Sequence, residues 1–157
     1  MVIGHAEGTR KALIVGLKSC VCAVPLTSVI ETMRPLSVEP ISGVPSFVQG
    51  ISIIRGIPTP VVDLGAVLGS ANERAERFVT LRVGDKQVAL SVHAVLGVRD
   101  LDAIITIQKL PPLLQRASKD VLETIGTLDE QVLMVLRAGW ALPDEVWQAL
   151  AAQEVVS

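Results

Sequence analysis

Apolar and polar residues alternate in short runs along most of the chain, a pattern typical of strands that bury one face. The first two runs, at residues 12–16 and 20–24, are separated by a short polar turn. Alternation in the second run places Cys20, Cys22 and Val24 on one face. These runs predict a pair of buried strands close to the start of the chain.

A second hairpin is predicted further along, where residues 51–54 and 57–62 are apolar and only Arg55-Gly56 separates them. Asn-Gly or Asp-Gly would be a stronger turn signal, but the two-residue spacing fits a tight hairpin. Pro58 and Pro60 lack the amide hydrogen that a ladder requires. We therefore expect the second strand of this hairpin to lie at a sheet edge.

The segments on either side of this hairpin are less regular. Leu26–Arg34 has an apolar spacing that fits either one helical turn or an irregular strand, and both remain open. Residues 36–45 form a loop marked by prolines, and Pro45 could begin a single helical turn through Val48. Asp63 is well placed to cap a short helix through Leu68 by accepting from free amides.

The chain contains a weak internal repeat. LIVGLKSCVCAV (13–24) and VTLRVGDKQVALSV (79–92) share the order strand, glycine-containing turn, strand. Each is followed by a valine-rich stretch, which ends at Arg34 or at Arg99. With the polar residues 70–77 as a connection, this repeat predicts two similar small β-units packed together.

The last third of the chain adds one more hairpin and a helix. Residues 103–119 contain two adjacent prolines and no clean period, so we expect a loop with at most one helical turn. Residues 124–128 and 131–136 flank Asp129-Glu130 and predict a final hairpin. A helix is predicted over 143–154, with proline and acidic residues in its first turn and an apolar stripe that packs on the body.

Composition supports β-structure and excludes several classes of function. Half of the 157 residues are hydrophobic, yet there is no Tyr and only two Phe and two Trp, so Val, Ile, Leu and Ala must fill the core. The 14 basic residues, against 16 acidic ones, form no stripe that would bind nucleic acid. No apolar run approaches the roughly 20 residues that span a bilayer. Residues 1–11 lack a signal-peptide core and are expected to be a disordered lead-in, which predicts a cytoplasmic protein without direct membrane insertion.

The residues that could carry chemistry form no convincing catalytic or metal site. Cys20 and Cys22 would supply two thiols, but tetrahedral zinc needs four ligands and only His5 and His93 are left. Nothing near Cys22 or His93 marks either as an activated catalytic group. No phosphate-binding loop and no nucleophile-elbow motif occurs. We expect no enzyme activity, no cofactor and no metal, and the roles of both cysteines and of His93 stay open.

Arg55 is the feature that composition does not explain. It stands at a tight turn between two strongly apolar strands, so its side chain must be exposed. A solvated turn arginine is one interpretation. The other is a contact residue, because arginine is enriched at the energetic centres of protein interfaces.

The segment VQGISIIRGIPTPVVDLG (48–65) resembles the signature of the CheW chemotaxis adaptor family, with its V-x-G, its L-R-G turn and its P-V-x-D-L strand end. Upstream, VPLTSVIE (24–31) is similar to the I-P-x-x-x-V-x-E segment of the family. The resemblance implies two SH3-like five-stranded β-barrels that share one core, here at about 12–69 and 78–140. This mainly β fold agrees with the two β-units that the internal repeat predicts.

The resemblance also implies a function. Family members are non-enzymatic scaffolds that couple the cytoplasmic tips of chemoreceptors to the regulatory domain of a chemotaxis histidine kinase. The chain would then be cytoplasmic and recruited to membrane-bound receptor arrays. Carried over by motif, the partner-binding residues would be Arg55, Glu31, Val29 and Gly56, and the structural turn or cap residues would be Gly50 and Asp63.

The chain departs from the family pattern, mostly in its second half. The departures are Ile54 for leucine, Cys22 for an aromatic residue, Thr32 for an aliphatic one, His93 for aspartate and Arg137 after Leu136. They put the partner contacts of the second barrel in doubt and suggest a divergent member, such as an adaptor of an accessory motility or gene-regulation pathway. A stand-alone β-barrel that senses a small ligand held between its halves is a further hypothesis.

Overall fold

The computed structural model describes residues 10–18, 20–68, 75–103, 105–107, 122–129, 131–136 and 146–149, without the side chains of 105–107 and 122–124. The first half of the chain supplies β1 (Lys11–Gly16), β2 (Val21–Pro25), β3 (Val29–Met33), β4 (Val48–Ile54) and β5 (Ile57–Asp63). The second half supplies β6 (Arg77–Val83), β7 (Lys86–Val92), β8 (Ala94–Asp100), β9 (Ile105–Ile107), β10 (Leu122–Leu128) and β11 (Gln131–Leu136). The helical segments are η1 (Leu26–Ser28), α1 (Leu64–Val67), η2 (Leu101–Ala103) and a turn at residues 146–149.

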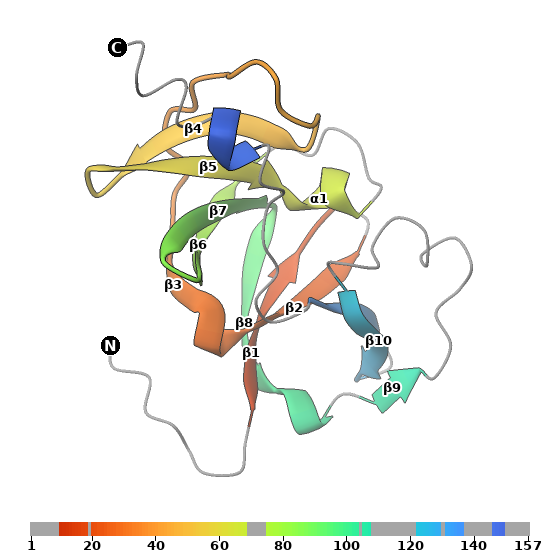
Figure 1. Cartoon of the computed structure of the whole chain (residues 1–157). Helices are drawn as coiled ribbons and strands as arrows, with labels where there is room; N and C mark the ends of the chain where they lie inside the picture. Colours follow the sequence, from red (N-terminus) through yellow and green to blue (C-terminus); the bar gives the residue numbers. More distant parts are fainter. Residues whose placement is uncertain are drawn as a thin grey trace.

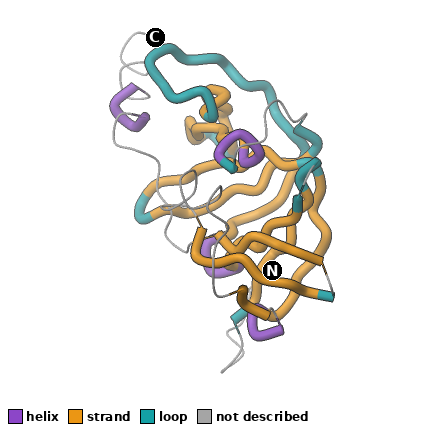
Figure 2. The backbone as a smooth tube through the Cα atoms, turned by 90° about the vertical axis from the view of Figure 1, so that its right-hand side faces the viewer, coloured by secondary structure: helices purple, strands orange, loops and turns teal. Residues whose placement is uncertain are grey.

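The strands form two sheets, so the fold is mainly β as predicted (Figure 1). One sheet has five strands in the order β3-β6-β7-β5-β4, and the other has six in the order β8-β1-β2-β11-β10-β9. Both are curved, barrel-like sheets (Figure 2), and η1, α1 and η2 each follow directly on a strand.

The two sheets have the same topology when β9 is set aside. In each, a hairpin ends in a strand that runs parallel to its neighbour: β5 beside β7, and β11 beside β2. The registers also correspond, because Val61 faces Ala89 in one sheet and Val135 faces Ala23 in the other. Even the irregularities match, since β3 and β8 each shift register once, and so do β4 and β10.

The internal repeat is therefore real, but its halves are interleaved. The first hairpin of each half pairs within the sheet that contains the last hairpin of the other half. The expectation that residues 12–69 and 78–140 each form one barrel does not match this strand pairing. The alternating pattern shows which face of a strand is buried, but it carries no information about which strand lies beside it.

The expected edge position of β5 is wrong, because β5 lies between β7 and β4, and β4 is the edge strand. Pro58 faces Ile53 and Pro60 faces Ile51 across the hairpin. Since the Ile54–Ile57 pair closes a two-residue turn, both prolines fall where no ladder bond to β4 is needed. On the opposite side, β5 pairs with β7 only from Val61 onward. The prolines are tolerated because this part of β5 is paired on one side only among the described residues.

Other expectations are refined. Leu26–Arg34 contains both alternatives, η1 followed by the irregular strand β3. The turn predicted from Pro45 is a single hydrogen bond, from Val48 N to Pro45 O at 3.0 Å, that leads directly into β4. Residues 105–107, which we expected to be loop, form β9 and pair with β10; all three are β-branched, which favours a strand.

Some predictions lie partly or wholly outside the described residues. Of the connection at 70–77 only its end is described, and of the lead-in only residues 10 and 11. Of the helix predicted over 143–154, the turn at 146–149 is described. Val146 in this turn is fully buried against the core, as the predicted apolar stripe requires.

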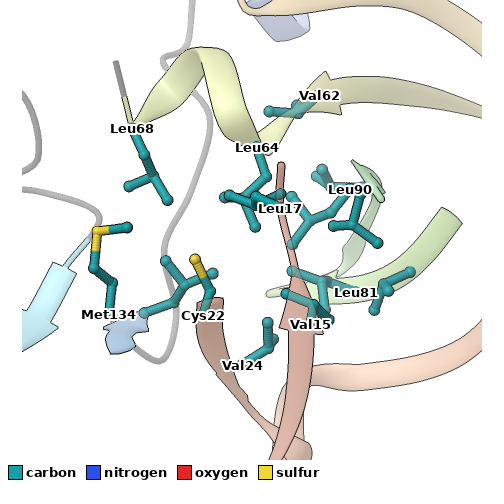
Figure 3. Packing of buried hydrophobic residues seen from close by; sticks show 14 of the residues in the cluster. Val15, Leu17, Cys22, Val24, Val62, Leu64, Leu68, Leu81, Leu90 and Met134 are labelled. Atoms are coloured by element: carbon teal, nitrogen blue, oxygen red, sulfur yellow. The ribbon is translucent and has the colours of Figure 1, made fainter. Parts of the chain in front are cut away.

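The largest apolar cluster lies between the two sheets and takes side chains from both. Figure 3 shows Leu64 and Leu68 from α1 and its C-terminal end meeting Cys22 of β2 and Met134 of β11. Two smaller clusters lie on the opposite faces, one around Ala12 and Ala23 and the other around Phe78 and Ala89. The confirmed face assignment of Cys20, Cys22 and Val24 puts all three on the shared cluster. Within the described part of the chain, no helix is long and apolar enough to cross a membrane.

Candidate functional site

The turn between β4 and β5 has the backbone of a tight two-residue hairpin. Arg55 has φ of 51° and Gly56 has φ of 78°, so both residues adopt the left-handed conformation that a type I′ turn requires. Glycine adopts it readily, whereas arginine does so at a cost of about 1 kcal/mol. The side chain of Arg55 is 77% exposed, as its position at the tip predicts.

Arg55 reaches across the open side of the five-stranded sheet to Glu31. Its Nε donates to both carboxylate oxygens of Glu31 at 3.0 Å. Glu31 belongs to β3, one edge of the sheet, and Arg55 follows β4, the other edge. The pair therefore joins the two edges and closes the sheet toward a barrel. An exposed ion pair adds only about 0–1 kcal/mol, so its main effect is to fix the geometry of this end.

A buried threonine holds Glu31 in place. Thr80 on β6 is 1% exposed, and its Oγ1 accepts from Glu31 N and donates to Glu31 O, each at 3.2 Å. These bonds lie at the register shift between Val29 and Glu31, where the regular ladder is interrupted. Sequence reasoning missed Thr80, although a polar residue on the inward face of an apolar strand is a signal that could have found it.

The remaining candidate contact residues differ in exposure. Val29 is half-buried and packs against the shared core, so only part of its side chain can meet a partner. A Cβ on Gly56 would meet nothing within 4 Å, so this glycine lies open at the tip. Exposed apolar residues flank the turn in sequence: Ile53 and Ile57 are among the most exposed large hydrophobic residues of the described chain, and Pro58 is exposed as well.

We call this region the Arg55 end, defined as Glu31, Ile53, Arg55, Ile57 and Pro58. It presents a held cation at the tip of a rigid hairpin, with exposed apolar side chains on both faces of that hairpin: Ile57 on one face, Ile53 and Pro58 on the other. Such a surface has no group arranged for covalent chemistry, but it fits a docking contact, since interfaces favour arginine within an apolar centre.

Gly50 and Asp63, the two expected structural residues, act in different ways. Asp63 is the N-cap of α1, and its Oδ1 accepts from Ala66 N at 3.2 Å. Gly50 is not at a turn, which corrects its grouping with the turn and cap residues. It lies at the register shift of β4 with φ of 148°, and an added Cβ would collide with the backbone oxygen of Glu39.

The reason for this close approach is a backbone bridge along the outer edge of β4. Glu39 and Ile51 exchange two hydrogen bonds, each 2.8 Å long. The loop before β4 thus covers part of the sheet edge, and only glycine at position 50 leaves room for it.

The cysteines and His93 lie apart from the Arg55 end. Cys22 is buried, Cys20 is half-buried, and both pack on the shared core. His93 is exposed at the bend between β7 and β8, and His5 lies outside the described residues. No three His, Cys, Asp or Glu side chains gather into a possible metal site among the residues described.

Comparisons with known proteins concern the fold and the family of the chain. The solved structure of the scaffolding protein TtCheW from Thermoanaerobacter tengcongensis superposes with a TM-score of 0.69, covering 82% of this chain and 89% of that one. The two sequences are 22% identical, so this likeness concerns the fold. The comparison with curated proteins gave no match. A model of the CheW-like domain matches residues 11–144, and the chain belongs to the CheW-like domain family.

Proposed function

We propose that this protein is a non-enzymatic adaptor that couples chemoreceptors to a chemotaxis histidine kinase. Membership of the CheW-like family and a fold shared with a scaffolding protein support an adaptor in general. The observation that carries the finer proposal is the Arg55–Glu31 pair, which holds an exposed arginine at the tip of an apolar hairpin.

The physical argument is one of preorganisation. An arginine free to rotate loses side-chain entropy when a partner immobilises it, whereas Arg55 is already held by Glu31 at 3.0 Å. The exposed side chains of Ile53 and Ile57 would lose water when a partner docks. The ionic contact then sets the orientation of the partner, and the exposed apolar side chains supply affinity.

In this proposal the two partners are the regulatory domain of the kinase and the cytoplasmic tip of the receptor. The chain would act on the cytoplasmic side and reach membrane-bound arrays through the receptor rather than by inserting itself. No reaction is catalysed, and signalling depends on which partners are held together.

Binding of the purified chain to each partner tests the proposal. Calorimetry with the regulatory domain and with a receptor-tip fragment should give a dissociation constant of tens of micromolar or lower for both. Absence of binding to either partner at about 50 micromolar protein would refute the adaptor function.

A charge reversal at the Arg55 end identifies its partner. Arg55→Glu should weaken one of the two complexes by about tenfold or more, because it replaces attraction to the partner by repulsion. Its thermal stability should stay nearly unchanged, since the exposed pair with Glu31 contributes little. Lys11→Glu, which breaks the exposed Lys11–Asp100 pair of the other sheet, is the matched control and should leave both complexes intact.

A further inference from the structure

The six-stranded sheet has a hollow of about 180 Å³ beside the turn that joins β10 to β11. Its aliphatic lining comes from five strands, through Ile14, Val21, Leu96, Leu128 and Leu133. Three polar side chains complete the lining, those of Arg99, Asp129 and Gln131. Because the lining is mixed, a molecule that fits the hollow must itself carry both an apolar part and charged or polar groups.

The corresponding positions in the five-stranded sheet are polar. The strand registers place three polar residues where the hollow has aliphatic ones: Thr80 for Ile14, Gln87 for Val21 and Thr59 for Leu133. Gln87 Nε2 donates to Thr59 Oγ1 at 3.1 Å, and Thr80 bonds to the backbone of Glu31. These polar groups are therefore satisfied within their own sheet. Since the two sheets share one topology, the fold does not require the aliphatic lining found in the six-stranded sheet.

Two opposite charges lie side by side at the rim of the hollow. Arg99 Nη1 donates to Asp129 Oδ2 at 2.9 Å, and the two side chains are 45% and 73% exposed. The tight turn fixes the place of the carboxylate, because Asp129 has the left-handed φ of 50°. An exposed ion pair of this kind contributes little stability, so a ligand can separate the two groups without unfolding the turn.

The paired charges select a zwitterion. An anion would be attracted by Arg99 but repelled by Asp129, and a cation would meet the reverse problem. An α-amino acid carries a carboxylate for Arg99 and an ammonium group for Asp129, so it replaces one charge-assisted contact by two. The side-chain amide of Gln131 can donate to the carboxylate or accept from the ammonium group.

The size of the hollow restricts the rest of the ligand. Sites for drug-sized molecules measure about 300–1,000 Å³, which is larger than this hollow. Since a water molecule takes about 30 Å³ in the liquid, 180 Å³ has room for roughly six non-hydrogen atoms. An aliphatic side chain of three or four carbons fits this space when the charged groups of the ligand lie at the rim.

We propose that this hollow binds a free α-amino acid with an aliphatic side chain, such as leucine or valine. In the proposed complex, Arg99 binds the carboxylate and Asp129 the ammonium group, while Ile14, Val21 and Leu133 contact the side chain. The site is a property of this chain alone and does not depend on the protein partners proposed above.

A titration of the isotope-labelled full chain with L-leucine, followed by NMR, tests the site. The dissociation constant should be about 1 mM or lower, and the amide signals around Asp129 should move most. Three compounds each lack one part of leucine: 4-methylpentanoate lacks the ammonium group, 3-methylbutylamine lacks the carboxylate, and glycine lacks the side chain. Each should bind about tenfold more weakly than leucine, because one of the three contacts is lost.

Two variants assign the charged groups of the ligand to their partners. Asp129→Asn should weaken leucine binding by about tenfold and abolish the preference over 4-methylpentanoate. Arg99→Gln should abolish the preference over 3-methylbutylamine instead. Lys11→Gln is the matched control, because it breaks the exposed Lys11–Asp100 pair of the same sheet without lining the hollow. All three changes affect exposed side chains, and circular dichroism checks that each variant is folded.

Several results would overturn the site. Unchanged spectra at about 10 mM leucine would exclude it. Equal affinity of the wild-type chain for leucine and for 4-methylpentanoate or 3-methylbutylamine would mean that the paired charges select no zwitterion. Leucine binding that neither Asp129→Asn nor Arg99→Gln weakens would place the ligand elsewhere. None of these results affects binding of the kinase regulatory domain or the receptor tip, so failure of the ligand site and failure of the adaptor function are distinguishable.

Discussion

The turns at Arg55 and Asp129 share a backbone conformation, with φ of 51° and 50°, but the side chains around the two turns differ. In the five-stranded sheet, the carboxylate of Glu31 accepts from Arg55, and the backbone of Glu31 is held by Thr80. In the six-stranded sheet, Gly97 occupies the position that corresponds to Glu31 and brings no side chain there. The two sheets therefore share one strand register although the side chains at these ends differ, because buried faces and register shifts determine the register.

The largest expected effect concerns Gly50, a position at which the two sheets differ. Its counterpart in the β10–β11 register is Thr124, so the dependence on glycine belongs to the five-stranded sheet alone. Gly50→Ala should lower the free energy of unfolding by about 3 kcal/mol, because it combines a strained φ with a collision against Glu39. Urea denaturation measures this loss.

The control for Gly50 is Gly56→Ala. Gly56 also has positive φ, but open space surrounds it, so the cost should be only about 1 kcal/mol. Equal losses for the two variants would show that the bridge between Glu39 and Ile51 imposes no close approach in solution.

The next prediction concerns whether the two sheets unfold as one cooperative unit. Val61 and Val135 correspond, and they are 0% and 3% exposed in the separate clusters of the two sheets. Val61→Ala and Val135→Ala should each cost about 2 kcal/mol and shift a single unfolding transition, because the first hairpins are exchanged between the sheets. Two resolved transitions in calorimetry, each moved by one variant, would contradict this prediction.

A smaller effect of opposite sign is expected at Ser52. Its hydroxyl is buried, and no described residue bonds to it, whereas Gly126 occupies the corresponding position in the other hairpin. Ser52→Ala should raise the free energy of unfolding by about 1 kcal/mol, because it removes an unsatisfied group. Thr80→Val, which deletes two hydrogen bonds to Glu31, should lower it in the same urea titration.

The smallest effects concern the two exposed ion pairs, Arg55–Glu31 and Arg99–Asp129. Glu31→Gln and Asp129→Asn should each change the free energy of unfolding by less than about 1 kcal/mol, and added salt should erase the change. Denaturation at low and high ionic strength checks both. A loss of several kcal/mol in either variant would make that pair a structural element rather than part of a binding surface.

Local structure was largely predictable from the sequence. Alternating apolar residues and two-residue gaps predict the hairpins at Arg55-Gly56 and Asp129-Glu130, and an aspartate before an apolar turn predicts the cap at Asp63. Each depends on residues close in sequence, for which propensity and side-chain bonding are sufficient arguments.

Long-range pairing was not predictable in this way. Nothing in β2 indicates that β11 lies beside it, and the exchange of hairpins therefore escapes any analysis of periodicity. The family resemblance named Arg55 and Glu31 without indicating that they touch. The correspondence between Gly97 and Glu31 was missed for a related reason, since it follows only from the registers of both sheets.

The parallel pairing of β2 with β11 has a consequence for synthesis. Roughly a hundred residues separate these strands, and ribosomes add about 5–20 residues per second. The first hairpin therefore waits on the order of 5–20 s for its neighbour, with the edge of β2 unpaired and with Ala23 not yet covered by Leu133 and Val135. During translation, the nascent chain is a natural client for chaperones that shield such surfaces.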